Sequence, residues 1–174
     1  MLRSIFGLVR SAILGIIVAL ILTSMFQPSR IQGTSMEPSV MNNNLVLLNK
    51  ASYWMAPPAY GDIVVFKANI FTDNGEGKML VKRVIGIEND EIEILEGRVY
   101  RNGRVVREDY AVGLNPEENM EKIKVAEGRV FVLGDHRDVS LDSRDKSIGQ
   151  VQVSDIVGKV AMRIFPFSEI GAVL

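Results

Sequence analysis

The feature that most constrains this fold is an uncharged apolar run near the N-terminus, from Ser11 to Phe26. Its 16 residues would span about 24 Å as an α-helix. Counted from Phe6, the stretch has 21 residues and reaches about 31 Å, enough to cross a hydrocarbon core of about 30 Å. Arg10 lies near the start of this longer stretch, where its side chain can reach the lipid headgroups. The sequence therefore predicts a transmembrane anchor over residues 6–26.

The charges that flank this run predict its orientation. Arg3 and Arg10 precede it, whereas only Arg30 follows it closely. The more positive flank of a membrane helix usually stays in the cytoplasm. We therefore expect residues 1–5 on the cytoplasmic side and residues 27–174 outside, as a single-pass protein of the cytoplasmic membrane.

Two other interpretations of the run are a cleaved signal peptide and the buried helix of a soluble domain. Cleavage requires small residues at the −3 and −1 positions. The run ends in Thr23, Ser24, Met25 and Phe26, and every register places a large residue at one of these positions. Together with the length of the run and its flanks, this favours an uncleaved anchor.

The composition narrows the chemistry that the chain can perform. Among its 174 residues there is no cysteine, and His136 is the single histidine. Disulfides, thiolate catalysis and metal sites built from cysteine or several histidines are therefore excluded. The net charge is −1, from 20 basic and 21 acidic residues spread along the chain, and no basic stripe indicates a nucleic acid partner. Hydroxyl, carboxylate, lysine and arginine chemistry remains.

Downstream of the apolar run, the sequence predicts β structure. Gln27-Pro28-Ser29 should end the helix because proline lacks the amide that a helix needs. Short runs with alternating or β-branched residues follow and predict strands at Leu45–Leu48, Ile63–Phe66, Met79–Ile85, Val130–Leu133 and Ile156–Ile164. Within Glu91–Glu108, Asn102-Gly103 between two apolar pairs predicts a type I′ hairpin. We expect a mainly β, mostly antiparallel domain over residues 27–174, closed or folded over enough to hide its edges, with residues 91–128 as a smaller insertion.

Two segments between the expected strands have contrasting compositions. Asn115–Lys122 is polar and predicts a loop or a short helical turn. Tyr53–Pro58 is apolar and aromatic, so it could fill the core or dip into the membrane interface, where Trp and Tyr are favoured. The sequence favours neither interpretation of this second segment.

A candidate nucleophile follows the anchor closely. Ser35 lies between Gly33 and Pro38, on constrained backbone of the kind that can present a hydroxyl at a surface. Alone the pattern is weak, because serine is common in turns. A nucleophilic serine also needs a base, since its free hydroxyl attacks poorly.

Two residues could supply that base. His136 would need a triad with an aspartate of its own loop, whereas Lys82 would need burial to make it neutral. In a strand, Leu80, Lys82 and Val84 share one face, so apolar neighbours would desolvate the lysine. Arg83 would face the opposite side and reach the rim or a carboxylate. The competing interpretation is that the Lys-Arg pair protects an edge strand from aggregation.

A third polar cluster spans Gly134–Arg144, directly after the expected strand Val130–Leu133. It combines turn residues with several aspartates, arginines and serines. A solvated loop is one interpretation. The other is a scaffold of bidentate salt bridges around a site.

Taken in order, these segments resemble the type I signal peptidase family of bacteria, in its Gram-positive-like form with one N-terminal anchor. The resemblance covers essentially the whole chain. Gly33–Ser39 resembles the family's nucleophile box, Gly61–Phe66 its second strand and Lys82–Gly86 its lysine box. Gly134–Arg144 resembles its Gly-Asp…Ser-x-Asp-Ser-Arg box, and Gly158-Lys159 follows as in the family.

The resemblance implies a β-barrel-like protease fold and a Ser–Lys dyad that works through an acyl-enzyme, with no metal and no organic cofactor. The partners would be the signal peptides of exported preproteins and the lipid bilayer, with the enzyme acting as a monomer. By position, the resemblance implies Ser35 as the nucleophile, Lys82 as the base and Ser140 as the hydroxyl that orients the lysine amine. It implies supporting roles for Asp135, Asp142 and Arg144. Signal peptides end in small residues, so we expect shallow apolar pocket walls from Ile31, Met36, Leu80 and Val81.

The chain departs from the family pattern at three places. Glu88-Asn89-Asp90 replaces the usual Pro-Gly-Asp after the lysine strand, and His136 stands where the family commonly has Asn. Gly33 stands where many bacterial members carry a serine that helps to bind the oxyanion. The oxyanion hole would then depend on backbone N–H groups, chiefly that of Ser35, and its second donor stays open.

Two rival functions need weighing. A self-cleaving repressor-type protease also uses Ser and Lys, but it would need an N-terminal DNA-binding domain where this chain has an apolar run. A catalytically inactive membrane-anchored module that binds export partners would have no reason to keep both Ser35 and Lys82. The sequence favours the peptidase.

Overall fold

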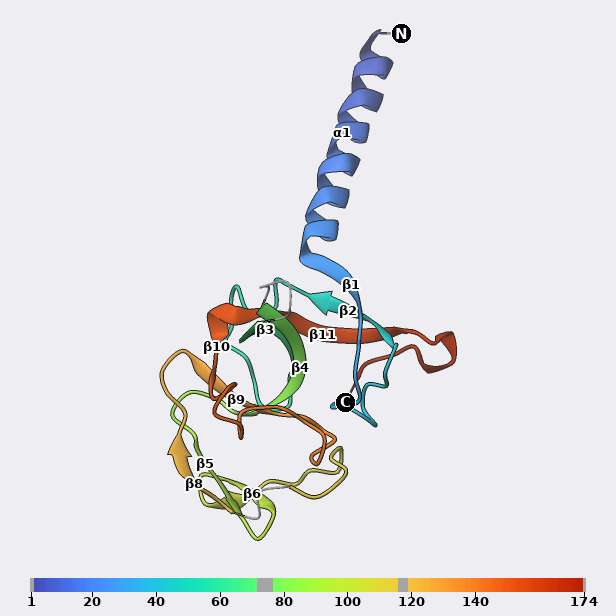
Figure 1. The fold of residues 1–174 in the computed structure, drawn as a ribbon. Coiled ribbons are helices and arrows are strands. Elements are labelled where there is room, and N and C mark those ends of the chain that lie inside the picture. The colour runs from blue at the N-terminus through green and yellow to red at the C-terminus, as the bar shows by residue number, and fades with distance from the viewer. Residues whose placement is uncertain (1, 72–76, 116–118, 174) are drawn as a thin grey trace.

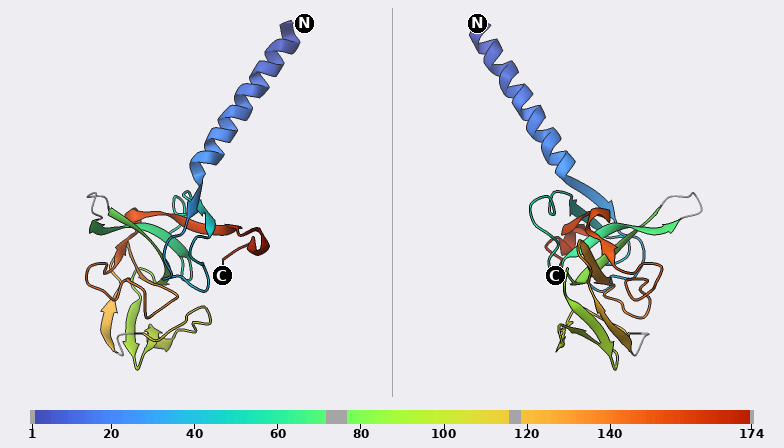
Figure 2. Two further views of the ribbon diagram at one scale, coloured as in Figure 1. Left: turned by 45° about the vertical axis from the view of Figure 1, so that its right-hand side comes forward. Right: turned by 90° about the vertical axis from the view of Figure 1, so that its left-hand side faces the viewer.

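A computed structural model describes residues 2–71, 77–115 and 119–173, and it consists of one long helix and two antiparallel sheets (Figure 1). The helix α1 covers Leu2–Met25 and projects away from the β body in all three views (Figures 1 and 2). It contains a segment, Gly7–Met25, that is long and apolar enough to cross a membrane, and none of this segment is buried against the β body. The helix ends just before Gln27-Pro28, as the sequence predicts.

The larger sheet has seven strands in the order β1-β2-β11-β3-β4-β9-β10, and every neighbouring pair is antiparallel. Its members are β1 (Phe26–Arg30), β2 (Leu45–Asn49), β3 (Ile63–Phe71), β4 (Gly77–Gly86), β9 (Arg129–Leu133), β10 (Val151–Gln152) and β11 (Ile156–Phe165). Two short 3₁₀ helices flank β11, at Val153–Asp155 and Phe167–Glu169. All five strands expected outside the hairpin region are present.

The smaller sheet has four strands in the order β7-β6-β5-β8, again all antiparallel. They are β5 (Glu91–Leu95), β6 (Arg98–Arg101), β7 (Arg104–Val105) and β8 (Met120–Lys124), at the end of the molecule far from α1 (Figure 1). Asn102 and Gly103 have φ angles of 53° and 73°. A type I′ turn requires positive φ at both central residues, so the predicted hairpin is confirmed.

Two elements differ from the sequence predictions. Strand β1 contains Pro28, and a strand is possible there because β1 is an edge of the sheet, where a missing N–H leaves no ladder bond unmade. The polar segment Asn115–Lys122 was expected to be a loop or helical turn, but its C-terminal part is strand β8, which pairs with β5. Tertiary pairing outweighed polar composition here. Residues 116–118 of that segment lie outside the described residues.

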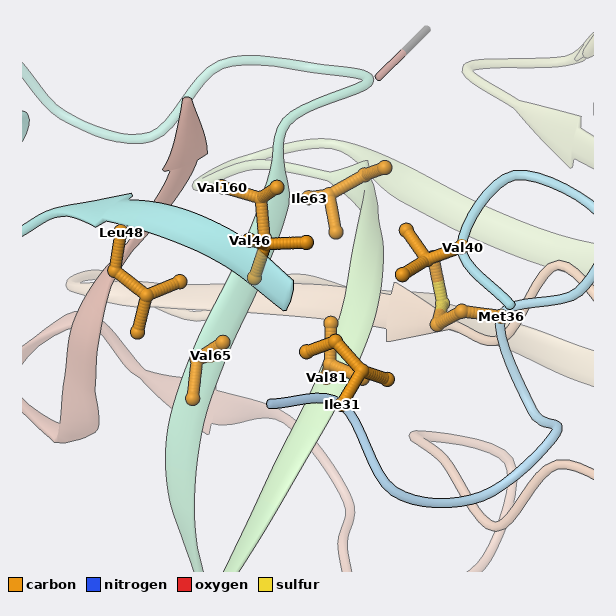
Figure 3. Packing of buried hydrophobic residues seen from close by; sticks show 9 residues of the cluster. All are labelled: Ile31, Met36, Val40, Val46, Leu48, Ile63, Val65, Val81 and Val160. Atoms are coloured by element: carbon orange, nitrogen blue, oxygen red, sulfur yellow. The ribbon is translucent and has the colours of Figure 1, made fainter. Parts of the chain in front are cut away.

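The core that positions the site lies on one face of the larger sheet (Figure 3). Side chains of β2, β3, β4 and β11 meet three residues of the segment between β1 and β2, and these three are Ile31, Met36 and Val40. Each of the three is at most 4% exposed. Burying such a side chain contributes about 1.5–3 kcal/mol, so this segment is pinned to the sheet rather than left as a free loop.

The apolar segment Tyr53–Pro58 is not a core plug in this structure. Trp54 and Met55 are 70% and 98% exposed, although Tyr53 is half-buried and donates a hydrogen bond to Asp62 Oδ2. The tip of the segment is therefore open to a membrane or a partner, and the stem is tied to the sheet.

Candidate active site

Ser35 lies in the tight segment that the core pins against the sheet. Its neighbour Met36 is buried, and the N–H of Glu37 donates to the carbonyl of Thr34 at 3.0 Å, which closes a turn around the serine. Gly33 has a φ of +99°, a region that L side chains rarely adopt. The backbone thus holds Ser35, which is half-buried, in a tight turn.

Lys82 lies in β4, an interior strand of the larger sheet that pairs with β3 and β9. It is 2% exposed, and Val64 is its cross-strand partner on β3. The side chains of Leu80 and Val84, which share its strand face, pack in one apolar cluster with Val64. The lysine is therefore buried rather than an edge-strand charge. Its Nζ lies 2.6 Å from Ser35 Oγ, within hydrogen-bonding distance.

This burial lowers the pKa of Lys82 from its usual value near 10.5 to about 8. Desolvation is the largest cause because an apolar environment disfavours the charged ammonium. The carboxylates of Asp142 and Asp135 act in the opposite direction, and the charges of Lys78 and Arg144 lower the pKa further. A substantial fraction of the amine is thus neutral near pH 8, and a neutral amine in contact with a hydroxyl can accept its proton.

Arg83 and Asp135 form a buried ion pair next to this contact. The guanidinium donates from Nε and Nη2 to the two carboxylate oxygens at 2.9 and 2.7 Å, and both side chains are almost fully buried. Arg83 also donates to Ser39 Oγ at 3.1 Å, on the far side of the serine turn. The pair therefore links the lysine strand, the serine segment and the loop 134–144.

A second pair, Asp142 with Arg144, organises the loop itself. Arg144 donates from Nε and Nη2 to Asp142 at 2.8 and 2.9 Å, and the same carboxylate accepts from the N–H of Gly134 at 2.9 Å. Asp142 is 1% exposed, so these bonds replace its lost hydration. The loop 134–144 is a salt-bridged scaffold rather than a solvated loop.

Gly134 is required where the loop meets the serine segment. A Cβ at this position would collide with the side chain of Ser140 and lie 2.5 Å from the carbonyl oxygen of Ser35. The N–H of His136 donates to that same carbonyl at 3.1 Å. Close backbone approach, which only glycine permits, therefore holds Ser35 against the loop.

Ser140 is close to the site, but its hydroxyl makes no hydrogen bond to any residue that the structure describes. The orienting contact with the Lys82 amine is thus not formed here and stays a prediction.

His136 is placed differently from a triad histidine. Its Nε2 lies 3.2 Å from Asp138 Oδ1, and within the described residues its Nδ1 has no hydrogen-bonding partner. The imidazole is therefore not hydrogen-bonded to Ser35 Oγ. The histidine contributes to the site through its backbone N–H.

A groove of about 640 Å³ opens over Ser35 and Lys82. Three of the four predicted wall residues line it: Ile31, Leu80 and Val81. The fourth, Met36, is 1% exposed and does not line the groove, because it packs in the core with Ile31 and Val40. Val139 and Leu141 from the loop 134–144 also line the groove, a position that the sequence alone does not indicate. Within the ranges described, no group of three or more His, Asp or Glu side chains could hold a metal ion.

Several contacts of the site have no signal in the sequence. Arg137 is 2% exposed and forms a bidentate pair with Glu108, which comes from the region of the smaller sheet. The ring of Tyr110 lies 4.1 Å from the guanidinium carbon of Arg83. The one signal in the sequence is the presence of two arginines within Gly134–Arg144, because buried arginines need carboxylate partners.

Comparison with known proteins decides the family. The model of the family described as signal peptidase, peptidase S26, matches residues 5–165. The chain belongs to the peptidase S26 family. The family resemblance inferred from the sequence is thereby confirmed.

Relatives in the S26 family cover nearly the full chain. The signal peptidase I of Bacillus licheniformis is 31% identical in an alignment of 180 positions, gaps included, that covers 97% of this chain and 92% of that protein. The signal peptidase I of Bacillus caldolyticus is 37% identical over 169 residues, covering 88% of this chain and 87% of that protein. Among solved structures, a signal peptidase I from Enterococcus faecalis V583 is 28% identical, with a TM-score of 0.46 over 59% of this chain and 96% of that chain.

Proposed function

We propose that the chain is a membrane-anchored serine endopeptidase of the signal peptidase I type, which removes N-terminal signal peptides from exported preproteins. The observation that carries the proposal is the 2.6 Å contact between Ser35 Oγ and the buried Lys82 Nζ. The S26 family match and relatives named signal peptidase I support the same function. An inactive binding module would have no need of a buried lysine, whose desolvation destabilises the fold.

The proposed reaction uses Ser35 and Lys82 as nucleophile and base. Neutral Lys82 takes the proton from Ser35 Oγ, which attacks the scissile carbonyl carbon and forms a tetrahedral intermediate. Lys82 then gives this proton to the leaving amine, and the C–N bond breaks to leave an acyl-enzyme. A water molecule then loses a proton to Lys82 and attacks the ester carbonyl. The C–O bond to Ser35 breaks, Lys82 returns the proton to Ser35 Oγ, and the signal peptide leaves with a free carboxylate.

The oxyanion of the intermediate needs hydrogen-bond donors. The N–H of Gly33 donates to Asn42 Oδ1 at 3.0 Å and is therefore occupied. The N–H of Ser35 makes no hydrogen bond to any other described residue, and we assign it as the principal donor.

The groove is suited to an extended chain that ends in small residues. Its apolar walls at the dyad come from Ile31 and Val81, which belong to the core, and from Leu80, which packs against a second apolar cluster. A preprotein with Ala at −3 and −1 fits this description, whereas Phe or Leu at −1 should be rejected.

The helix α1 supports a single membrane anchor, and we assign the β domain to the extracytoplasmic side. Arg3 and Arg10 at the N-terminal flank support this side. Protease added to wall-stripped cells should then digest the β domain. Digestion only after lysis would contradict the orientation.

The function is tested with the full chain in detergent micelles and a purified preprotein. The expected result is a single cut, with N-terminal sequencing placing it after an Ala-x-Ala-like site. The Ser35→Ala variant, which removes only the hydroxyl, should leave the preprotein intact. An uncut preprotein with the wild-type chain would refute the proposal.

A further inference from the structure

One segment outside the loop 134–144 contacts all three arginines that hold this loop. It comprises residues 108–115, which follow β7 of the smaller sheet, and we call it the strap. Each contact joins a strap side chain to a different guanidinium. The contacts are Glu108 with Arg137, Tyr110 with Arg83, and Asn115 with Arg144.

The contact of Glu108 with Arg137 is bidentate. Arg137 donates from Nη1 and Nη2 to the two carboxylate oxygens at 2.7 and 2.6 Å. The side chain of Arg137 is 2% exposed and that of Glu108 is 14% exposed. A paired, desolvated guanidinium of this kind has a fixed orientation, because two parallel charge-assisted bonds define both its position and its plane. Glu108 therefore sets where the Arg137 guanidinium lies.

Arg137 in turn holds the backbone that touches the serine. Its Nε donates to the carbonyl of Gly134 at 2.9 Å. Gly134 packs against the Ser35 carbonyl, and His136, one residue before Arg137, donates to that carbonyl. Arg137 thus connects Glu108 to the backbone of Ser35 by two routes: its bond to the Gly134 carbonyl and its chain neighbour His136.

The backbone of the strap adds to this hold. The N–H of Val112 donates to the carbonyl of Asp135 at 2.8 Å, and the N–H of Arg137 donates to the carbonyl of Val112 at 2.9 Å. Gly113 approaches Asp138 so closely that a Cβ would collide with the carboxylate. The strap is therefore laid against the loop on both sides of His136, and it does not simply pass nearby.

We propose that Glu108 is a positioning residue, which acts through Arg137 to fix Ser35 in register with Lys82. This role rests on the proposed function. Glu108 does not line the groove and has no contact with the dyad, so it belongs to neither the substrate-binding wall nor the reacting atoms. Misplacement of a nucleophile by about 1 Å can slow a reaction about 100-fold. The strap thereby supports catalysis, because it carries the carboxylate that orients the loop.

The test is Glu108→Gln in the full chain, which keeps the shape of the side chain and removes its charge. We expect kcat for preprotein cleavage to fall about tenfold or more, with KM within about twofold, after correction for the folded fraction. Asp109→Asn is the matched control, because Asp109 is the adjacent carboxylate and its ion pair with Arg107 is solvent-exposed. The control should keep wild-type kcat and KM.

A double variant separates positioning from stability. Replacing Glu108 and Arg137 by Met removes both charges, so thermal stability should recover relative to Glu108→Gln. The kcat should stay low because the bond to the Gly134 carbonyl is lost.

Recovery of kcat in the double variant, or an unchanged kcat in Glu108→Gln, would overturn the positioning role while leaving the proposed function intact. A wild-type enzyme that leaves the preprotein uncut would refute the proposed function and the role of Glu108 with it.

Discussion

Replacing Lys82 by Met should inactivate the enzyme and at the same time stabilise its fold. Methionine has a similar length and shape but no charge. Lys82 is 2% exposed, and its neighbours on the same strand face are apolar. The pKa of Lys82 is lowered to about 8, chiefly by desolvation, so at neutral pH the folded protein holds an ammonium where a neutral group is favoured.

The size of this effect follows from the pKa of the lysine in the two states. Folding lowers the pKa from near 10.5 to about 8, so the unfolded state binds more protons between these values and stability rises with pH. At pH 6.5 the ammonium is present in both states, and the shift destabilises the fold by about 3 kcal/mol. At pH 9.5 the native lysine is mostly neutral, and the remaining penalty is about 1 kcal/mol.

Urea unfolding of the full chain in micelles, followed by circular dichroism, measures the free energy of unfolding at pH 6.5 and at pH 9.5. Lys82→Met should raise the free energy of unfolding by up to about 3 kcal/mol at pH 6.5, and by about 2 kcal/mol less at pH 9.5. Lys67→Met is the matched control, because Lys67 is exposed on the neighbouring strand β3 and should give no such gain. A destabilised Lys82→Met, or a gain that does not depend on pH, would refute the reasoning.

Three further substitutions test individual parts of the site. Gly134→Ala should abolish cleavage, because the new Cβ would collide with Ser140 and press on the Ser35 carbonyl; a cleavage assay that finds wild-type turnover would contradict this close approach. Asp135→Asn removes the negative charge from the buried ion pair with Arg83 and should destabilise the protein by about 3–5 kcal/mol, measured by urea unfolding. His136→Asn should keep most of the activity, because the backbone N–H that binds the Ser35 carbonyl is retained; loss of turnover in the same cleavage assay would show that the imidazole is needed.

The local features of this fold could be predicted because each rests on neighbouring residues. Asn102-Gly103 has the backbone that a type I′ turn demands. The alternation of residues around Lys82 is enough to predict that its side chain shares a strand face with apolar neighbours. Pro28 ended the helix through its missing amide, although the edge strand that follows depended on pairing with β2. Periodicity and special backbone residues thus predicted most strands and the burial of Lys82 in one of them.

The rest depended on contacts between distant segments. Nothing near Glu108 in the sequence indicates that it pairs with Arg137, 29 residues away, because that pairing requires the smaller sheet to fold against the loop. Met36 is next to Ser35 in the sequence, so the sequence predicts it in the groove wall. The structure places it in the core instead, because Ile31 and Val40 pack with it there. Tertiary packing therefore decided which side chains complete the site.

The pH dependence of kcat/KM for preprotein cleavage tests the Ser–Lys dyad most directly. With the pKa of Lys82 near 8, kcat/KM should rise about tenfold between pH 7 and pH 9 and then level off, in both the wild type and His136→Asn. Lys82→Ala should show no turnover at any pH. A profile that levels off near pH 6.5, together with loss of activity in His136→Asn, would indicate a histidine base and contradict the account.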